Sequence, residues 1–504
     1  MNKNRICRSV SLYLCAVMMS GTAISAISCA DSETAPHTGA QSETSEGTAA
    51  AVTEALSPEQ QALTEALRGL DGVDMGGYNF RIMDRNSEES VNWMTIDVWA
   101  ESETGDTITD AVYQRNRYLE ENMNIVISEI AVQKPAESAK TAIMAGTDMF
   151  DVFTDGLTQL SSMAVEGYLT DLIGIETLKL TECWWDQEMR TDLSVAEKLF
   201  YITGDISIMD NYGTWCVMFN KNFITDYDLD DPYALVRNGT WTLDVMYDMA
   251  KTVSADLDGN GRMDTSDQWG FLTESFNEYG LWASGGQRII GKDESDYPML
   301  TMMSDQAVSV IDHVSEMMND TAVTQNASNI DDGYTINNEH FGSGHALFIY
   351  GGMWLITKYR GYNVEFGILP APKFDAAQDR YYNTYSNDNC TAYSIPLTAE
   401  NPEQIGQIME AMAEISKYTL TPAYYEKALK GKYLRDEESA EMLDIILSQR
   451  WYDLGMIFDW GDLFSKITEL SQGSKLDFAS TYEKRRKAAQ REIDDYISLL
   501  DALK

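Results

Sequence analysis

Predicted strands and helices alternate in the first third of this chain, and this alternation constrains the fold more than any other feature. Runs of alternating or apolar residues predict strands at 78–83, 124–130 and 151–154. Helices are predicted between them: Thr109 is expected to cap the first, and the second should begin at Pro135 and end at Gly146. A β-α-β-α-β succession needs a parallel sheet with helices on its faces, so the predicted fold class is α/β.

The ends of the predicted strands indicate where a small molecule would bind. In open parallel sheets, ligands lie beyond the carboxyl ends of the strands. Asp155 directly follows the third predicted strand, so we expect it at the rim of a binding site. Later apolar patterns predict strands at 214–219 and 390–395, and helix faces within 243–250, 308–318, 405–412 and 482–500.

The chain is too long for one hydrophobic core, and it is strongly acidic. With 504 residues it should divide into two lobes. Its formal net charge of −43 repels nucleic acids and anionic headgroups, and it favours cations or neutral ligands. The basic run at 484–487 is therefore interpreted as a solvated helix face rather than a nucleic-acid site.

The first 57 residues have the pattern of an export signal followed by a flexible tether. Basic residues precede a largely apolar stretch at 9–28, which predicts a signal peptide over residues 1–28. A run rich in Ser, Thr, Ala and Glu follows, and it predicts a flexible tether over 29–57. The rest of the chain is therefore expected outside the cytoplasm.

Cys29 stands at the junction of these two segments. The sequence Ala26-Ile27-Ser28-Cys29 resembles the bacterial lipobox, in which the cysteine is lipidated and becomes the first residue. This resemblance implies a lipid anchor on the extracellular face of a Gram-positive-type cell membrane. Ordinary signal cleavage after Ser28 is the alternative, and it would release the chain.

Three further cysteines lie beyond the predicted tether, at Cys183, Cys216 and Cys390. Their wide spacing fits neither a zinc site nor a disulfide scaffold. We expect buried free thiols at these positions, with a Cys183–Cys216 bridge as the alternative.

Residues 256–267 have the spacing of a calcium-binding loop. Calcium takes roughly six to eight oxygen ligands in a flexible geometry. Gly261 fills loop position six, where the chain turns sharply, and Arg262 would offer its backbone carbonyl. The side-chain ligands would be Asp256, Asp258, Asn260, Asp264 and Asp267. We predict a structural calcium ion here, with an unliganded acidic turn as the alternative.

Short motifs, ordered from about Tyr78 to the C-terminus, carry a family resemblance. The stretch 145–152 resembles an entry into a third strand, and Gly239-Thr240-Trp241-Thr242 resembles a helix start after a first crossing between lobes. Further motifs lie at 168–172, 184–186, 201–205, 217–221, 344–354 and 366–373. In this order and spacing they resemble extracellular solute-binding proteins of family 1, the lipoprotein receptors of bacterial ABC sugar importers.

The resemblance implies a type II binding-protein fold, in which two lobes joined by hinge strands close on a ligand. The first lobe would hold 76–214 and 391–430, and the second 216–389 and 431–504. The crossings between them would lie near 216–219 and 390–393. The resemblance also implies a monomeric receptor without enzymatic activity, which captures a carbohydrate, expected to be an oligosaccharide, and delivers it to an ABC permease.

Sugar sites combine aromatic planes with carboxylate and amide groups, because sugars present apolar faces and hydroxyl edges. By position in the family pattern, the candidate ligand-binding residues are Asp155, Asp210, Asn211, Tyr212, Trp282, Gly285, Gly286, Trp354, Tyr385 and Asn387. Core packing is the alternative for each tryptophan, and it is favoured for Trp241. Trp451 and Trp460 flank a loop that could close over a sugar ring.

Two other classes of protein stay open: an exported glycoside hydrolase and a carbohydrate-binding surface adhesin. A glycosidase needs two carboxylates at a set separation, and the 80 acidic residues leave that option open. However, the sequence contains no serine-nucleophile elbow, zinc-protease helix or glycine-rich phosphate loop. We therefore expect no catalytic residues and a small-molecule ligand.

Overall fold

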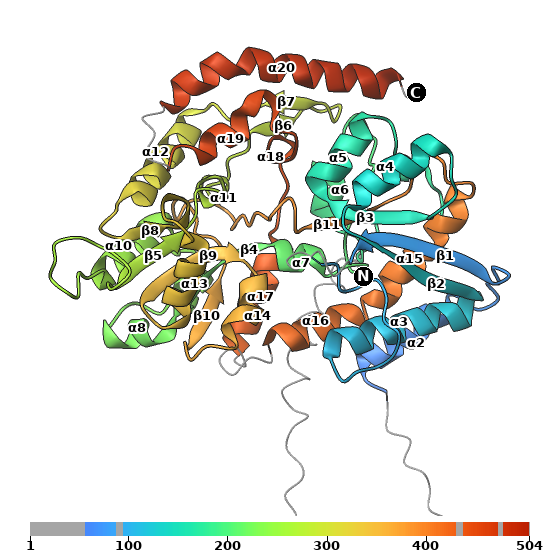
Figure 1. Cartoon of the computed structure of the whole chain (residues 1–504), viewed down its shortest axis with the longest axis horizontal. Coiled ribbons are helices and arrows are strands. Elements are labelled where there is room, and N and C mark those ends of the chain that lie inside the picture. Colours follow the sequence, from blue (N-terminus) through green and yellow to red (C-terminus); the bar gives the residue numbers. More distant parts are fainter. Residues whose placement is uncertain (1–55, 87–93, 430–436, 472–476, 503–504) are drawn as a thin grey trace, which may run out of the picture.

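The computed structural model describes residues 56–86, 94–429, 437–471 and 477–502. Two β-sheets form the centres of two lobes that stand side by side (Figure 1). The first sheet has the strand order β11-β3-β1-β2, and the second has the order β10-β4-β9-β5-β8. The two-lobe α/β fold predicted from the sequence is confirmed.

The first lobe contains the predicted β-α-β-α-β succession. Strand β1 is parallel to β2 and β3, whereas β11, from a distant part of the chain, is antiparallel to β3. Figure 1 shows α4 and α5 on one side of this sheet and α2, α3 and α15 on the other. The bounds are α2 (Pro58–Arg68), β1 (Tyr78–Arg85), α3 (Thr107–Met123), β2 (Ile125–Val132), α4 (Pro135–Ala145), β3 (Val152–Gly156), α5 (Leu157–Val165), β11 (Thr391–Ser394), α15 (Pro402–Ser416) and α16 (Leu420–Leu429).

The second lobe has a mixed sheet surrounded by helices. Strand β5 is parallel to β8 and β9, whereas β4 is antiparallel to β9 and β10. The bounds are β4 (Trp215–Asn220), α8 (Lys221–Asp226), α9 (Pro232–Arg237), α10 (Leu243–Val253), β5 (Trp269–Thr273), α11 (Asn277–Ser284), α12 (Asp305–Asn319), β8 (Thr324–Asn326), α13 (Gly333–Gly342), β9 (Ala346–Gly352), α14 (Trp354–Tyr359), β10 (Phe366–Leu369) and α17 (Glu437–Ser448).

Shorter elements lie between and above the two sheets. Figure 1 shows α20 lying above α19 and a small hairpin, β6–β7, with α18 beneath them. Helix α20 contacts both α5 of the first lobe and α12 of the second, so the C-terminal segment touches both lobes. The bounds are α6 (Gln187–Asp192), α7 (Met209–Gly213), β6 (Ile290–Lys292), β7 (Pro298–Leu300), α18 (Leu454–Phe458), α19 (Leu463–Thr468) and α20 (Phe478–Ala502), with single 3-10 turns at Leu172–Gly174, Ala327–Asn329 and Trp460–Asp462.

Strand pairing places the carboxyl ends of both sheets beside the segments that connect the lobes. In the first lobe, the last residue of β3, Gly156, pairs with Thr391 at the start of β11. In the second lobe, the last residue of β9, Gly352, pairs with Trp215 at the start of β4. Because β4 and β11 each follow a crossing between lobes, both carboxyl edges lie close to the boundary between the lobes.

The first helix of the β-α-β-α-β succession begins earlier than the sequence pattern predicted. Thr109 was expected to be its cap, but the capping residue is Asp106. The Asp106 carboxylate accepts hydrogen bonds from the amides of Ile108 and Thr109, at 3.1 and 3.2 Å. The second predicted helix starts at Pro135 and ends at Gly146, which adopts a left-handed conformation with φ 63°, as expected.

Cys216 and Cys390 are buried free thiols, as predicted. Cys183 is disulfide-bonded, so the expectation of a free thiol at this position is wrong, and the free state of Cys216 excludes a Cys183–Cys216 bridge. The predicted signal peptide, Cys29 and all but the last two residues of the tether lie outside the described residues. Among the helices that are described, none has the length and apolar composition of a membrane span.

Candidate functional site

Asp155 lies at the carboxyl end of β3, where the sequence predicted the rim of a binding site. Its side chain is buried and forms an ion pair with the Arg85 guanidinium. It also accepts a hydrogen bond of 2.9 Å from the Ala136 amide. Arg85, the last residue of β1, also donates to the carbonyl oxygen of Asp388, at 3.2 Å. Asp155 thus links two strand ends to the start of α4, and Arg85 connects this rim to the second crossing segment.

The first crossing segment carries a buried ion-pair cluster. The Arg450 Nη2 atom lies 2.6 Å from Asp210 Oδ2 and 2.5 Å from Asp186 Oδ2. Its Nη1 atom lies 3.0 Å from Thr214 Oγ1 and 3.3 Å from Asn211 Oδ1. The side chains of Arg450, Asp186 and Asp210 are each less than a tenth exposed. Arg450 therefore ties the helix before β4 to the segment that follows α17.

Burial raises the pKa of Asp210 to about 7, and the charge of Arg450 opposes that rise. A buried carboxylate is costly unless a cation and hydrogen bonds compensate it. The predicted site residues Asp210 and Asn211 are brought together here, but Arg450 uses their oxygen atoms. Sequence analysis did not find Arg450, because it lies 240 residues from Asp210 and carries no local motif.

The second crossing segment carries several buried polar atoms that have no hydrogen-bond partner. The Asn387 amide nitrogen donates to the carbonyl of Met456 at 2.9 Å, while its Oδ1 atom is unpartnered. Tyr385 packs against Tyr452 with ring centroids 4.6 Å apart, while its hydroxyl group is also unpartnered. The side-chain oxygen of Asn389 is unpartnered as well, as are those of Thr391, Tyr393 and Ser394 in strand β11, which follows this segment. Buried polar groups normally have hydrogen-bond partners, so the free oxygens of Tyr385, Asn387 and Asn389 keep hydrogen-bonding capacity for water or a hydroxyl-rich ligand.

Aromatic and guanidinium groups form a stack at the lobe boundary. The rings of Tyr382 and Trp451 are 4.4 Å apart. Arg288 lies over Trp451 at 4.2 Å, and Arg380 lies over Tyr382 at 4.9 Å. Trp451 was named from the sequence as one of two tryptophans beside a closing loop, and the structure places it in this stack.

The other predicted aromatic residues lie in several different environments. Trp282 is fully buried in α11, and its Nε1 atom donates to the carbonyl of Ala307 at 3.1 Å. Trp354 is half-buried at the start of α14, and its Nε1 atom lies 3.2 Å from the hydroxyl group of Tyr334. Tyr212, also half-buried, meets the ring of Tyr424 edge-on at 5.4 Å.

The predicted aromatic and glycine residues differ in whether a ligand could contact them. Trp282 is part of the core and cannot touch a ligand in this arrangement, whereas Trp354 and Tyr212 expose part of their rings. Gly285 and Gly286 end α11, and Gly286 has φ 77°, with Tyr382 close by. Trp460 is stacked on Phe458 at 4.6 Å, with the two rings nearly parallel.

The predicted calcium loop lies between α10 and β5. Side-chain oxygens of Asp256, Asp258 and Asp267 lie within 4.8 Å of one another. Gly261 has φ 80°, which supplies the sharp turn expected at loop position six. Amide hydrogen bonds, first that of Gly261, lower the pKa of Asp256, so its carboxylate stays ionised. The donor set of clustered carboxylate oxygens fits a hard cation such as calcium.

Of the other predicted ligands, Asp264 lies outside this group of three carboxylates, and Asn260 approaches it through its amide nitrogen rather than its oxygen. The Asn260 amide nitrogen lies 2.9 Å from Asp258 Oδ2 and 3.3 Å from Asp264 Oδ2. Asp267 is buried, and its oxygens accept hydrogen bonds from the amides of Leu257 and Asp264, at 2.8 and 2.7 Å. The Arg262 amide donates to Asn260 Oδ1 at 2.8 Å, which keeps the loop compact.

Comparison with solved structures shows the same two-lobe arrangement in sugar-binding ABC substrate-binding proteins. A cyclo/maltodextrin-binding protein complexed with maltotetraose is 15% identical over 84% of this chain and 96% of its own, with a TM-score of 0.54. The maltose/maltodextrin-binding domain MalE from Bdellovibrio bacteriovorus, bound to maltotriose, is 15% identical over 82% of this chain and 100% of its own, with a TM-score of 0.51. At such low identity, these matches establish the fold alone.

A third match has the same character. An ABC substrate-binding protein from Listeria monocytogenes in complex with cycloalternan is 14% identical over 84% of this chain and 99% of its own, with a TM-score of 0.50. These three structures are of binding proteins rather than enzymes. Neither a family model nor a curated protein sequence matches the chain.

Proposed function

We propose that this protein is a receptor that binds a carbohydrate, in particular an oligosaccharide, between its two lobes. The observation that carries the proposal is the convergence of both carboxyl strand edges on a crossing segment rich in buried, unpartnered polar atoms. Such atoms suit a neutral ligand with many hydroxyl groups, and nearby aromatic rings suit its apolar faces. The sugar-bound proteins that share the fold support this choice.

Direct binding measurements test the proposal. Calorimetry and thermal-shift assays would use maltotriose, maltotetraose and a panel of plant and host glycans. At least one of these sugars should bind saturably and be recovered chemically unchanged. Small-angle scattering should show the lobes closing when that ligand binds. Release of a shorter sugar would indicate a hydrolase instead, and the absence of any binding across the panel would contradict the proposal.

Trp354 provides a test at the level of one residue. Trp354 is half-buried and lies two residues after the carboxyl end of β9, so Trp354→Ala should weaken sugar binding at least tenfold. Tyr227→Ala is the matched control, because Tyr227 is an exposed aromatic residue at the end of α8. Equal affinity in both variants would remove Trp354 from the site.

Delivery to an ABC permease and anchoring through Cys29 belong to the same proposal. A receptor that works beside a membrane permease has to stay near it while its lobes move, and a lipid anchor followed by a flexible tether allows this. We also propose a monomeric receptor without enzymatic activity, divided at the residue boundaries predicted from the sequence. Calcium in the 256–267 loop would stabilise the second lobe.

A further inference from the structure

The β6–β7 hairpin of the second lobe reaches the first lobe and binds a turn there. Asp296, near the tip of the hairpin, accepts three hydrogen bonds from this turn. Its carbonyl oxygen accepts from the Ala196 amide at 3.0 Å, and its Oδ2 atom accepts from the Glu197 amide at 3.0 Å. Its Oδ1 atom accepts from the Ser194 hydroxyl group at 3.1 Å. One residue of the second lobe thus binds three polar groups within residues 194–197 of the first.

The turn that Asp296 binds is strained. Val195 and Lys198 are joined by two backbone hydrogen bonds of 3.0 Å, which leaves a two-residue turn between them. Both turn residues, Ala196 and Glu197, have positive φ angles, of 52° and 60°. Turns of this type favour Asn-Gly, because other residues clash with the backbone at positive φ. Strain of this kind persists where the surroundings hold it, and here Asp296 binds both strained amides.

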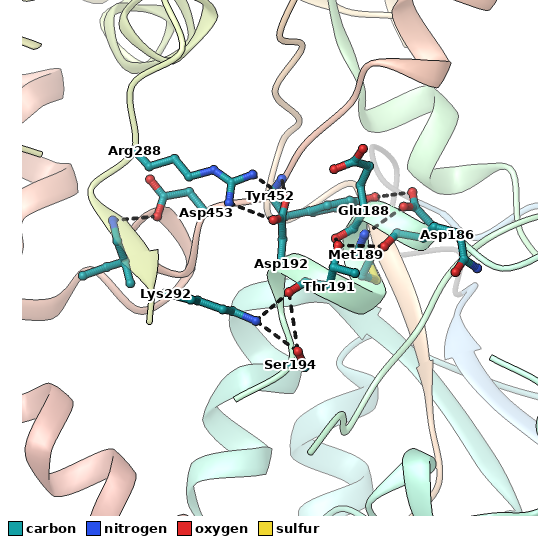
Figure 2. Close-up of polar contacts among 12 residues, drawn as sticks. Asp186, Glu188, Met189, Thr191, Asp192, Ser194, Arg288, Lys292, Tyr452 and Asp453 are labelled. Carbon is teal, nitrogen blue, oxygen red and sulfur yellow. Dashed lines mark hydrogen bonds and ion pairs between the residues drawn. The ribbon is translucent and has the colours of Figure 1, made fainter. Parts of the chain in front are cut away.

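Two cations of the second lobe bind the adjoining helix α6 and its end. The Arg288 guanidinium makes two parallel bonds of 2.7 Å to Asp192 (Figure 2). Lys292 Nζ lies 2.6 Å from the carbonyl oxygen of Thr191 and 3.0 Å from the Ser194 hydroxyl group (Figure 2). A two-point guanidinium–carboxylate pair is directional, so these bonds fix the hairpin's position on the first lobe.

The contacts made by Arg288, Lys292 and Asp296 are on the whole more accessible to water than the Arg450 cluster. At the crossing, the side chains of Arg450 and Asp186 are 6% and 9% exposed. In the contacts of the hairpin region, the side chains of Arg288 and Asp192 are 25% and 10% exposed, and those of Lys292 and Asp296 are 14% and 22% exposed. The buried pair suits a permanent pivot. The outer groups can exchange their protein partners for water, as parts that separate would require.

We propose that Arg288, Lys292 and Asp296, together with their partners at 191–197, form an inter-lobe latch. The latch holds the two lobes in the arrangement of this structure, and it releases when the lobes rearrange. The proposal depends on the geometry of the two lobes and is independent of the identity of the ligand. Its failure would therefore leave the sugar-binding proposal untouched, and the reverse also holds.

Asp296→Ala in the full-length chain is the direct test. Hydrogen exchange at the Ala196 and Glu197 amides should become at least tenfold faster, because the variant removes the carboxylate bound to Glu197 and weakens the hold of the hairpin. Small-angle scattering without ligand should show a larger radius of gyration, because the lobes can separate on this side. Glu294→Ala is the matched control: it removes an exposed carboxylate two residues away on the same hairpin, and both readings should stay at the wild-type values.

Salt provides a second test that needs no substitution. In 1 M sodium chloride the wild-type scattering should shift towards that of Asp296→Ala, because partly exposed ion pairs are screened. The variant itself should respond less. If exchange at 196–197 accelerates while the scattering of variant and wild type stays identical at both salt concentrations, the hairpin makes only a local contact and the latch is refuted.

Discussion

Asp84 is a buried acidic residue whose environment departs strongly from that of a surface carboxylate. Neither of its carboxyl oxygen atoms accepts a hydrogen bond from an N–H or hydroxyl group of the described residues. It lies on β1 beside Glu129, with Asp97, Tyr393 and Arg115 buried nearby. Burial raises the pKa of Asp84 to about 9, and the charges of Glu129 and Asp97 add to the rise. When Asp84 is protonated, its carboxyl O–H can donate a hydrogen bond to the Glu129 carboxylate. This hydrogen bond explains how an acidic side chain can be buried at this position.

The raised pKa predicts that the protein loses stability as the pH increases. The folded state keeps a proton on Asp84 that the unfolded state releases near pH 4, so the stabilisation is complete below that pH and lost by about pH 9. The slope from this group is at most about 1.4 kcal/mol per pH unit. Asp84→Asn should flatten the fall in melting temperature between pH 5 and pH 9.

The exposed residue Asp71 gives the control for this experiment. Asp71→Asn changes the same charge on the surface, and its melting temperature should follow the wild-type pH dependence. An Asp84→Asn variant with an unchanged slope would mean that Asp84 is already ionised in the folded protein.

At the scale of single elements, the start of α3 depends on which side chain caps the free amides of its first turn. Thr109 and Asp106 are both acceptable capping residues, and the apolar pattern alone could not choose between them. Asp106 is the cap because its carboxylate reaches two free amides and also pairs with Lys427 of α16 at 3.0 Å. Sequence patterns fix the periodic part of a helix better than its first turn.

This assignment predicts different costs for two neighbouring substitutions. Asp106→Ala should lower the free energy of unfolding by about 1 kcal/mol, the usual cost of losing a cap. Thr109→Ala, three residues away, should change it by less than about 0.5 kcal/mol. Urea denaturation followed by circular dichroism measures both, and a reversed order would restore Thr109 as the cap.

The calcium loop allows a prediction at the same scale. If calcium binds the carboxylates of Asp256, Asp258 and Asp267, a chelator should lower the melting temperature by several degrees, because binding stabilises the folded state. Asp258→Asn should remove most of this response. Asp226→Asn, at an exposed position outside the loop, should keep it. A wild-type melting temperature that ignores chelator and added calcium would contradict the assignment.

At the scale of the whole molecule, the two lobes are connected in three distinct ways. The crossing segments join them covalently, Arg450 joins them through a buried cluster, and the β6–β7 hairpin joins them at the water-accessible edge. These connections differ in burial, and so in how easily they can open. Under the proposed receptor function, closure on a ligand would need a pivot that persists and contacts that can exchange, and these are the parts proposed for the Arg450 cluster and the hairpin contacts.

The sequence by itself determined the α/β class, the two-lobe arrangement and the parallel direction of β1, β2 and β3. The two lobes follow from the length of the chain. The other two features follow from residues that are close together in the chain, where a period of two or 3.6 residues records which face is buried. The spacing of the calcium loop is local in the same way. Asp155 could also be placed at a strand end from the sequence, because the end of a strand is itself a local signal.

Only the tertiary structure decided which groups meet at the lobe boundary. Arg450 pairs with Asp186 and Asp210, and Asp296 binds the 194–197 turn, across separations that no sequence period records. The same holds for Trp282, whose ring packs in the core because α11 turns it towards Tyr279 and Phe478. Burial and pairing depend on the positions of distant segments in space, and local side-chain patterns carry no information about those positions.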